Sequence, residues 1–212
     1  MLFRSIFMAY PTVSAPYGFK AINRYDGIPY AGATLQLPIS GSYNTAIYNG
    51  DTVKLDGGTI TLSGATTSGT VLGVFVGVQY KNSSGQTVQA QYYPGTSVTN
   101  AIAYVVVDPA AEFKVAVTTS GTAGTVTYAN ATILGCNVAT VYGTGSTVTG
   151  DSGSSIVKPA NGAGDTSTLP FRVVGLVPDT AYYVSSTLVY PEVIVKMNTS
   201  QLLGATGTTY TA

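Results

Sequence analysis

Apolar residues recur at every second position through most of this chain of 212 residues. The alternation is clear in residues 35–39, 88–93, 113–117 and 193–197. A repeat of two is what a β-strand with one buried face requires, and the β-branched and aromatic bias of these segments reinforces it. No segment shows a convincing 3.6-residue apolar stripe with helix caps. The sequence therefore predicts an all-β protein.

Turn residues divide these segments at short intervals. Asp-Gly and Asn-Gly pairs, which supply the positive φ of tight turns, occur at Asp26-Gly27, Asn49-Gly50, Asp56-Gly57-Gly58 and Asn161-Gly162. Strands separated by turns at about 8–12 residues are typical of a sandwich or barrel. Residues 71–80 and 101–107 are more continuously apolar and suit central strands. We predict an antiparallel β-barrel or sandwich with an extended N-terminal arm and long Gly/Ser/Thr loops.

The predicted domain organisation has four parts. They are an extended N-terminal arm at 1–16, a main β-barrel domain at 17–117, a loop-rich insertion at 118–168, and closing strands with a C-terminal tail at 169–212. Pro11 and Pro16 favour extended backbone in the arm, and the segment from Tyr10 to Tyr17 carries two tyrosines without strand alternation. We expect the arm to pack on another molecule; the alternative is a frayed terminus. Met8 is as good a candidate for the first residue as Met1.

The composition excludes several kinds of chemistry. The chain has no His, one Cys and only 8% Asp, Glu, Lys and Arg, against about 25% in an average soluble domain. Without His, neither a Ser-His-Asp nor a Cys-His arrangement can be assembled. The single Cys136 allows no intrachain disulfide or Cys-rich metal site, and we expect it to be a small buried apolar residue. We predict that the chain is not an enzyme and has no catalytic residues and no cofactor.

The nine acidic residues offer two weak alternatives. Asp108 and Glu112 are the nearest candidates for a paired-carboxylate site, but Asp108 precedes Pro109 and a turn role is favoured. Asp151 and Asp165 lie in a Gly-rich stretch that could wrap a cation, although Gly/Asp turns are common. We therefore predict no metal site and expect the acids to stand mostly at turns.

The charge pattern limits the choice of partner. Nine Lys and Arg residues balance nine acids and are scattered singly, so there is no basic stripe for nucleic acid. The longest apolar runs, such as 101–107, fall short of the about 18 residues that suggest a membrane span. A charge-poor surface resists association weakly, so we expect neighbours to cover much of it.

Tyrosine is the abundant residue type suited to contacts, with 16 copies. Its large amphipathic ring is enriched at protein interfaces. The alternative is that these tyrosines simply decorate strands. The predicted capsid or subunit contacts are Tyr10, Pro11, Val13, Pro16, Tyr17, Phe19, Tyr25, Tyr30, Tyr43 and Tyr48.

An ordered set of sequence blocks resembles tailed-phage head decoration (cement) proteins. The first block is Ser14-Ala15-Pro16-Tyr17-Gly18-Phe19-Lys20. The blocks that follow in order are 28–39, 47–55, 71–80, 92–96, 103–109, 113–115 and 171–176. The resemblance covers most of residues 14–117 and the short block near residue 175, but not residues 118–168 or the tail after Met197.

The resemblance implies a virion structural protein on the outer face of the capsid. Its partners would be the major capsid protein lattice and, in a homotrimer, two further copies of itself. Such a protein cements neighbouring capsid subunits and so stabilises the head. One alternative is a tail, fibre or spike component that binds a host surface glycan. A further alternative is a polysaccharide hydrolase, which would depend on an acid such as Asp108 or Glu112.

Overall fold

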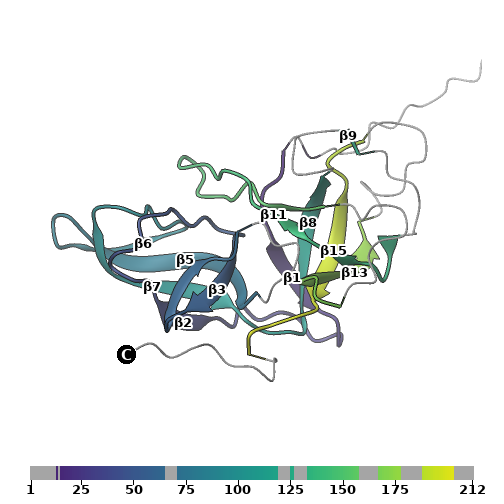
Figure 1. The fold of residues 1–212 in the computed structure, drawn as a ribbon, viewed down its shortest axis with the longest axis horizontal. Helices are drawn as coiled ribbons and strands as arrows, with labels where there is room; N and C mark the ends of the chain where they lie inside the picture. Colours follow the sequence, from purple (N-terminus) through teal and green to yellow (C-terminus); the bar gives the residue numbers. More distant parts are fainter. Residues whose placement is uncertain are drawn as a thin grey trace, which may run out of the picture.

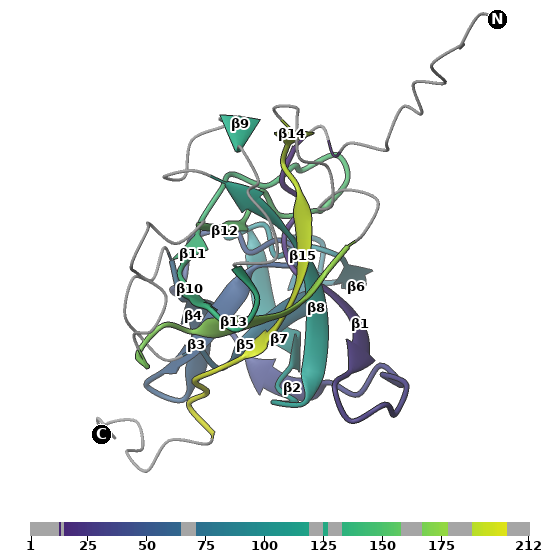
Figure 2. The ribbon, with the colours of Figure 1, turned by 90° about the vertical axis from the view of Figure 1, so that its right-hand side faces the viewer.

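Every regular element that the structure describes is a β-strand, as the alternation predicts. The structure is a computed structural model, and it describes residues 13, 15–64, 71–118, 125–126, 133–157, 167–177 and 188–202. Most of the strands form two large sheets that make two lobes of one elongated molecule (Figure 1), and one short pair of strands forms a small third sheet. In a view along the long axis of the molecule, the second lobe lies in front of the first (Figure 2).

The first sheet is antiparallel and curls into a nearly closed barrel, the barrel lobe. In spatial order its strands are β2 (Leu35–Pro38), β7 (Val98–Val106), β5 (Gly73–Asn82), β3 (Thr52–Asp56) and β4 (Thr59–Leu62). A further strand, β6 (Thr87–Ala90), pairs with the second half of β5. The two ends of this order, β2 and β4, lie next to each other, so the sheet almost closes on itself.

The second sheet brings together strands from both ends of the chain and forms the second lobe. In spatial order its strands are β10 (Asn137–Val138), β13 (Phe171–Leu176), β15 (Glu192–Met197), β8 (Ala111–Thr118), β12 (Ser155–Val157) and β11 (Thr140–Val141). The strand β1 (Lys20–Arg24) also pairs with β8, antiparallel, while β12 runs parallel to β8. Beside this sheet, β9 (Thr125–Val126) pairs with β14 (Leu188–Val189).

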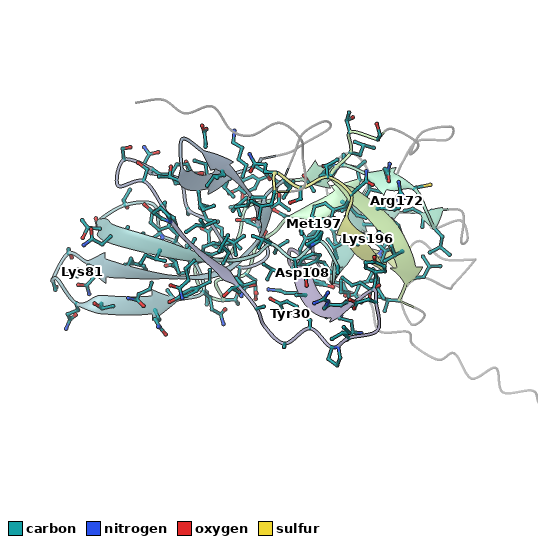
Figure 3. All side chains as sticks on the ribbon, turned by 90° about the horizontal axis from the view of Figure 1, so that it is seen from below. Tyr30, Lys81, Asp108, Arg172, Lys196 and Met197 are labelled. Atoms are coloured by element: carbon teal, nitrogen blue, oxygen red, sulfur yellow. The ribbon has the colours of Figure 1, made fainter. Side chains whose placement is uncertain are left out.

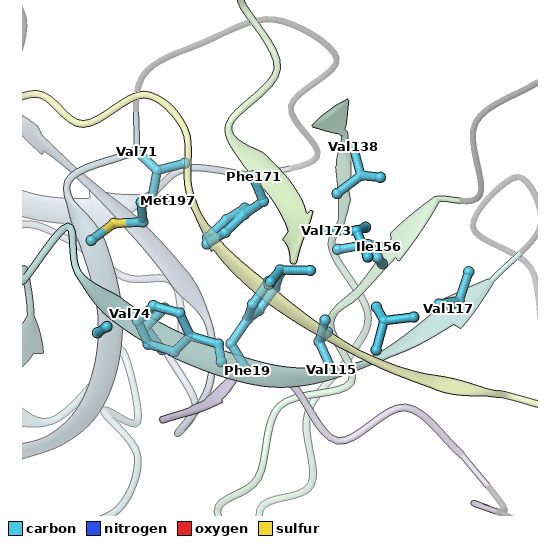
Figure 4. Packing of buried hydrophobic residues seen from close by; sticks show 14 of the residues in the cluster. Phe19, Val71, Val74, Val115, Val117, Val138, Ile156, Phe171, Val173 and Met197 are labelled. Atoms are coloured by element: carbon cyan, nitrogen blue, oxygen red, sulfur yellow. The ribbon is translucent and has the colours of Figure 1, made fainter. Parts of the chain in front are cut away.

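Each lobe has its own hydrophobic core. The barrel core is built from Ile39, Ile47, Val53, Ile60, Leu72, Phe75, Val78, Tyr93, Ala101, Ala103 and Val105. The second-lobe core includes Phe19, Val74, Val115, Val117, Val138, Ile156, Phe171, Val173, Val195 and Met197 (Figure 4). Strand β5 serves both, because Val74 packs in the second lobe while Phe75 packs in the barrel.

The pairing of the strands differs from the predicted domain division. Residues 17–117 do not form one barrel, because β1 and β8 pair in the second sheet while β2 to β7 make the barrel. Residues 133–157 of the predicted insertion supply β10, β11 and β12, so they are part of the second sheet. Alternation shows that a segment is a strand, but it does not tell which distant strand it will pair with.

The predicted strands and several of the predicted turns are confirmed. The segments 35–39, 71–80, 101–107, 113–117 and 193–197 overlap β2, β5, β7, β8 and β15. Gly57 and Gly58 connect β3 to β4 with φ values of 53° and 81°. Two consecutive positive φ values are what a type I′ hairpin turn needs. Asn161-Gly162 lies outside the described residues.

Phe19 provides a test of the second-lobe core. Its side chain is fully buried, with its ring 4.6 Å from the Phe171 ring in a stacked arrangement and 6.5 Å from Phe113 edge-on. We expect Phe19→Ala to lower the free energy of unfolding by about 3–5 kcal/mol, since it removes this contact and leaves a cavity. In the same denaturant titration the control Val148→Ala, at a side chain that is 93% exposed, should change stability by less than about 0.5 kcal/mol.

Candidate functional site

Two of the predicted contact residues are core residues instead. Phe19 is 0% exposed and Tyr48 is 7% exposed. Phe19 packs against Phe171, and Tyr48 stacks on Tyr92 with ring centroids 5.5 Å apart. Their burial within the chain contradicts a role in contacting the capsid or another subunit. Residue type alone could not separate them, because an aromatic ring suits a core as well as an interface.

The other tyrosines differ in how accessible they are. Tyr25 is 59% exposed, and the Lys196 Nζ lies 4.4 Å from its ring centroid. Tyr30 is partly buried against the second-lobe core, and its hydroxyl donates to the Ala33 carbonyl at 2.9 Å. Tyr43 is partly buried against the barrel core, and its hydroxyl accepts from the Leu62 N–H at 3.0 Å. Tyr25 is thus the most open of these three.

Tyr17 anchors the segment that follows the predicted arm. Tyr10 and Pro11 lie outside the described residues, while Val13, Pro16 and Tyr17 are half-buried. The Tyr17 hydroxyl donates to the buried Glu192 carboxylate, which also pairs with Lys114 Nζ at 3.1 Å. Burial, reinforced by Glu192, raises the pKa of Tyr17 well above its usual range. The Tyr17 hydroxyl therefore keeps its proton and remains the donor of this hydrogen bond.

The main polar cluster of the molecule lies between the lobes and centres on Asp51, which is fully buried. One carboxylate oxygen, Oδ1, accepts from the hydroxyls of Ser152 at 2.5 Å and Ser154 at 2.8 Å. The other oxygen, Oδ2, accepts from the Tyr48 N–H at 2.8 Å. Asp51 therefore ties the loop before β3 to the segment before β12.

Two glycines let the backbones pass each other beside Asp51. The Gly18 N–H donates to the Ser154 carbonyl at 3.0 Å, and the Phe19 N–H donates to the Gly50 carbonyl at 2.9 Å. The Gly50 N–H in turn donates to the Phe75 carbonyl at 2.8 Å. Gly18 and Gly50 have φ values of +79° and +96°, and a Cβ on either would lie within 3.0 Å of backbone atoms of the other segment. We call this region, residues 18–20, 48–51 and 151–154, the junction.

The sequence predicts only an ordinary tight turn at Asn49-Gly50, and the junction is not among its predicted features. The signal that could have pointed to it is an acid, Asp51, that directly follows an Asn-Gly pair and leads into the apolar-alternating residues 53–55. Its partners Ser152 and Ser154 lie about a hundred residues away in a Gly/Ser stretch, with separations of 101 and 103. Serines in such a stretch are indistinguishable from loop residues, so no local pattern joins them to Asp51.

Lys20 lies at the edge of the junction and contacts two of its other residues. Lys20 Nζ lies 2.6 Å from Asp151 Oδ1 and 3.0 Å from Asn49 Oδ1. The Asn49 side-chain amide donates to the Val76 carbonyl at 3.2 Å. The side chains of Lys20 and Asp151 are 31% and 40% exposed, so this ion pair stands at the rim of the buried cluster.

The electrostatics of Asp51 are dominated by its burial. Removal from water raises the pKa of Asp51 above its usual value and outweighs the opposing effects. Those effects are the hydrogen bonds from Ser152, Tyr48 and Ser154 and the positive charge of Lys20, which lower the pKa. The carboxylate is therefore held in place by donors that only partly offset its lost hydration.

Two of the acids that the sequence offers as catalytic or metal-binding candidates, Asp108 and Asp151, have structural partners. Asp108 Oδ1 accepts from the Ala110 N–H at 2.9 Å, and Arg24 lies 3.3 Å from Oδ2, so the predicted turn role is confirmed. Asp151 pairs with Lys20, and Asp165 lies outside the described residues. Within the described ranges, no three or more His, Cys, Asp or Glu side chains converge as a metal site would require.

Two further features concern single residues and segments. Cys136 is half-buried and packs against the second-lobe core, so it is less enclosed than predicted. The part of the chain that the structure describes contains no helix with the length and hydropathy of a membrane span.

No protein-family model, curated protein or solved structure matches this chain. A function is therefore proposed from the residues themselves and from the block resemblance described above.

The carboxylate of Asp51 should be needed for the junction to hold. Asp51→Ala leaves the hydroxyls of Ser152 and Ser154 and the Tyr48 N–H without their acceptor. We expect a loss of about 2 kcal/mol or more in the free energy of unfolding, because unsatisfied buried donors are costly. The control is Asp56→Ala, whose side chain is 65% exposed, and it should have little effect in the same titration.

The raised pKa of Asp51 also predicts a pH dependence. A carboxyl whose pKa is higher in the folded chain contributes stability below its unfolded pKa of about 3.9, and this contribution is lost as pH rises through the folded pKa. We expect the stability of the wild type relative to Asp51→Asn, which does not titrate, to fall between about pH 4 and pH 7. Urea unfolding of both proteins across this range measures it, and a difference that rises with pH would contradict the prediction.

Proposed function

We propose that this chain is a virion structural protein that binds the outer surface of a phage capsid. In this role it cements neighbouring major capsid subunits and so stabilises the head. The sequence resemblance to head decoration proteins motivates the proposal, and one structural observation carries it further. The blocks that bear the resemblance meet in the residues on which this fold depends.

The junction shows this assembly most directly. Blocks 14–20, 47–55 and 71–80 supply Gly18 with Phe19, Gly50 and Phe75, whose backbones hydrogen-bond in succession. Blocks 103–109, 113–115 and 171–176 add Val106, Phe113 and Phe171 to the second-lobe core. If the resemblance reflects a shared fold, its blocks should supply the contacts that build that fold, and these blocks do so. Their convergence supports a resemblance in fold as well as in sequence.

The use of the charged residues also favours a structural role. Asp26 pairs with Arg24, Asp151 with Lys20, and Glu192 with Lys114. Asp51 accepts three hydrogen bonds inside the protein. A cement protein needs a stable fold and an adhesive surface and has no need of a proton-transferring group. Many copies on one shell add their contacts, so each contact can be modest. A homotrimer would suit the three-fold positions of a capsid.

One feature favours the alternative of a tail, fibre or spike component that binds a glycan. The segment 142–150 forms a loop with Val148 93% exposed, and it stands out from the body of the molecule as the green loop of Figure 1. Copy number separates the two functions. Hundreds of copies on each particle would support decoration, whereas about a dozen would support a tail or vertex position.

Capsid binding tests the proposed function and the arm together. Purified chain is added to expanded capsids that lack it, and we expect saturable binding at a fixed ratio to the shell protein. Removal of residues 1–16 leaves Tyr17 and its partner Glu192 in place and should weaken binding about tenfold or more. Circular dichroism of the shortened chain is the control for an intact β fold.

The experiment distinguishes a failure of the decoration proposal from a failure of the predicted role of the arm. Failure of the full chain to saturate would overturn the decoration proposal. Full-strength binding by the shortened chain would leave decoration standing and would show that the arm makes no essential contact.

A further inference from the structure

Lys20, Asn49 and Asp151 bring an amine, a carboxamide and a carboxylate together at the rim of the junction. Lys20 Nζ lies 3.0 Å from Asn49 Oδ1, which places it one bond further from the side-chain carbonyl carbon, Cγ. The same amine lies 2.6 Å from Asp151 Oδ1. The amine therefore contacts both the carboxamide oxygen of Asn49 and the carboxylate of Asp151, although the three residues come from separate segments.

We propose that Lys20 and Asn49 join in an intramolecular isopeptide bond, with Asp151 carrying the proton. This modification goes beyond the proposed function and does not depend on it. It requires only groups that the chain supplies.

The reaction balances without a co-reactant. Asp151 accepts a proton from the Lys20 ammonium, and the neutral amine attacks Asn49 Cγ. The bond from Lys20 Nζ to Cγ forms, and the bond from Cγ to Asn49 Nδ2 breaks. Asp151 returns its proton to Nδ2, one of the two protons left on Lys20 Nζ follows it, and Nδ2 leaves as ammonium. The product is a secondary amide, and no atom is oxidised or reduced.

The surrounding backbone fixes each partner. Lys20 lies on β1 opposite Lys114 of β8. Asn49 forms an isolated parallel β-bridge with Asp151 through the backbone, and its N–H donates to the Gly150 carbonyl at 2.9 Å. The Asn49 Nδ2 donates to the Val76 carbonyl at 3.2 Å, while Oδ1 accepts from the amine. Groups held in this way react as if present at very high concentration, which can replace a separate catalyst.

The charged groups around Lys20 and its exposure to water affect the rate of bond formation. Asp151 pairs with Lys20, Lys20 acts electrostatically on the buried Asp51, and Lys114 lies opposite Lys20 across the β1–β8 pair. Lys20 and Asp151 are 31% and 40% exposed, so water also stabilises their ion pair. We therefore expect the bond to form slowly after folding. Each molecule needs only one turnover, so a slow reaction is enough.

The bond would act as a covalent tie between the lobes. It would connect β1 of the second lobe to the segment before β3 of the barrel and close a ring from residue 20 to residue 49. A cross-link of this kind restricts the unfolded chain in the way that a disulfide does. Unlike a disulfide, it would survive reducing conditions.

Mass spectrometry of the full folded chain tests the proposal. After incubation at mildly alkaline pH, where more lysine amine is unprotonated, we expect an intact mass lower by one ammonia. Trypsin cannot cleave after an acylated Lys20. It should therefore release a branched peptide in which residues 5–24 are joined to residues 25–54. This branched peptide replaces the separate peptides 5–20, 21–24 and 25–54 of the unlinked chain. Fragmentation should assign the bond to Lys20 and Asn49.

Three variants separate this bond from other losses of ammonia. Asn49-Gly50 could also lose ammonia as a succinimide, which involves the Gly50 nitrogen and not Lys20. Lys20→Arg keeps the positive charge but has no attacking amine, so it should abolish the loss. Asp151→Asn should slow cross-linking about 100-fold, because it removes the proton carrier. Lys81→Arg, far out on the barrel lobe (Figure 3), should cross-link like the wild type.

Two results would overturn the proposal. One is an unchanged mass in folded wild-type chain after prolonged incubation, which would make the three side chains a hydrogen-bonded cluster only. The other is a loss of ammonia that persists in Lys20→Arg, which would assign it to a succinimide.

Discussion

The close approach of backbone at Gly18 and Gly50 is the constraint on which the rest of the structure depends. Each of the two lobes has a core, but neither core explains why the lobes share one geometry. The hydrogen bonds that run from Ser154 through Gly18, Phe19 and Gly50 to Phe75 join the segment before β12, the segment before β1 and strand β5. A side chain on either glycine would push these backbones apart.

Asp51 makes this contact specific. A buried carboxylate is tolerated only where donors surround it, because its lost hydration must be offset. Here the donors come from Tyr48, Ser152 and Ser154, so the 151–154 segment has to be in place for the loop before β3 to be satisfied. A second tie lies on the C-terminal side, where the Gln201 side-chain amide both donates to and accepts from the backbone of Leu55 at 3.0 and 2.6 Å. Contacts from the end of the chain thus fix the barrel lobe against the second lobe.

The scarcity of charge takes on a physical meaning in this arrangement. Most of the acids described by the structure hold turns, strands or the junction, for example Asp108, Asp51 and Glu192. Little charge remains to keep other proteins away, which suits a molecule that is packed among neighbours. The aromatic residues fall into buried and exposed groups. Phe19 and Tyr48 build the interior, while Tyr25 is exposed.

The sequence by itself determined the all-β class, the position of most long strands, and hairpin turns such as Gly57-Gly58, because side-chain alternation and positive φ are local properties. It also determined the turn role of Asp108. Only the tertiary structure decided that β1 and β8 pair in the second sheet instead of the barrel, and that Phe19 and Tyr48 are buried. It also brought Asp51, Ser152 and Ser154 together, with Lys20 beside Asn49 and Asp151. These outcomes depend on contacts between residues far apart in the chain, and a pattern with a period of two carries no information about which distant partner will supply them.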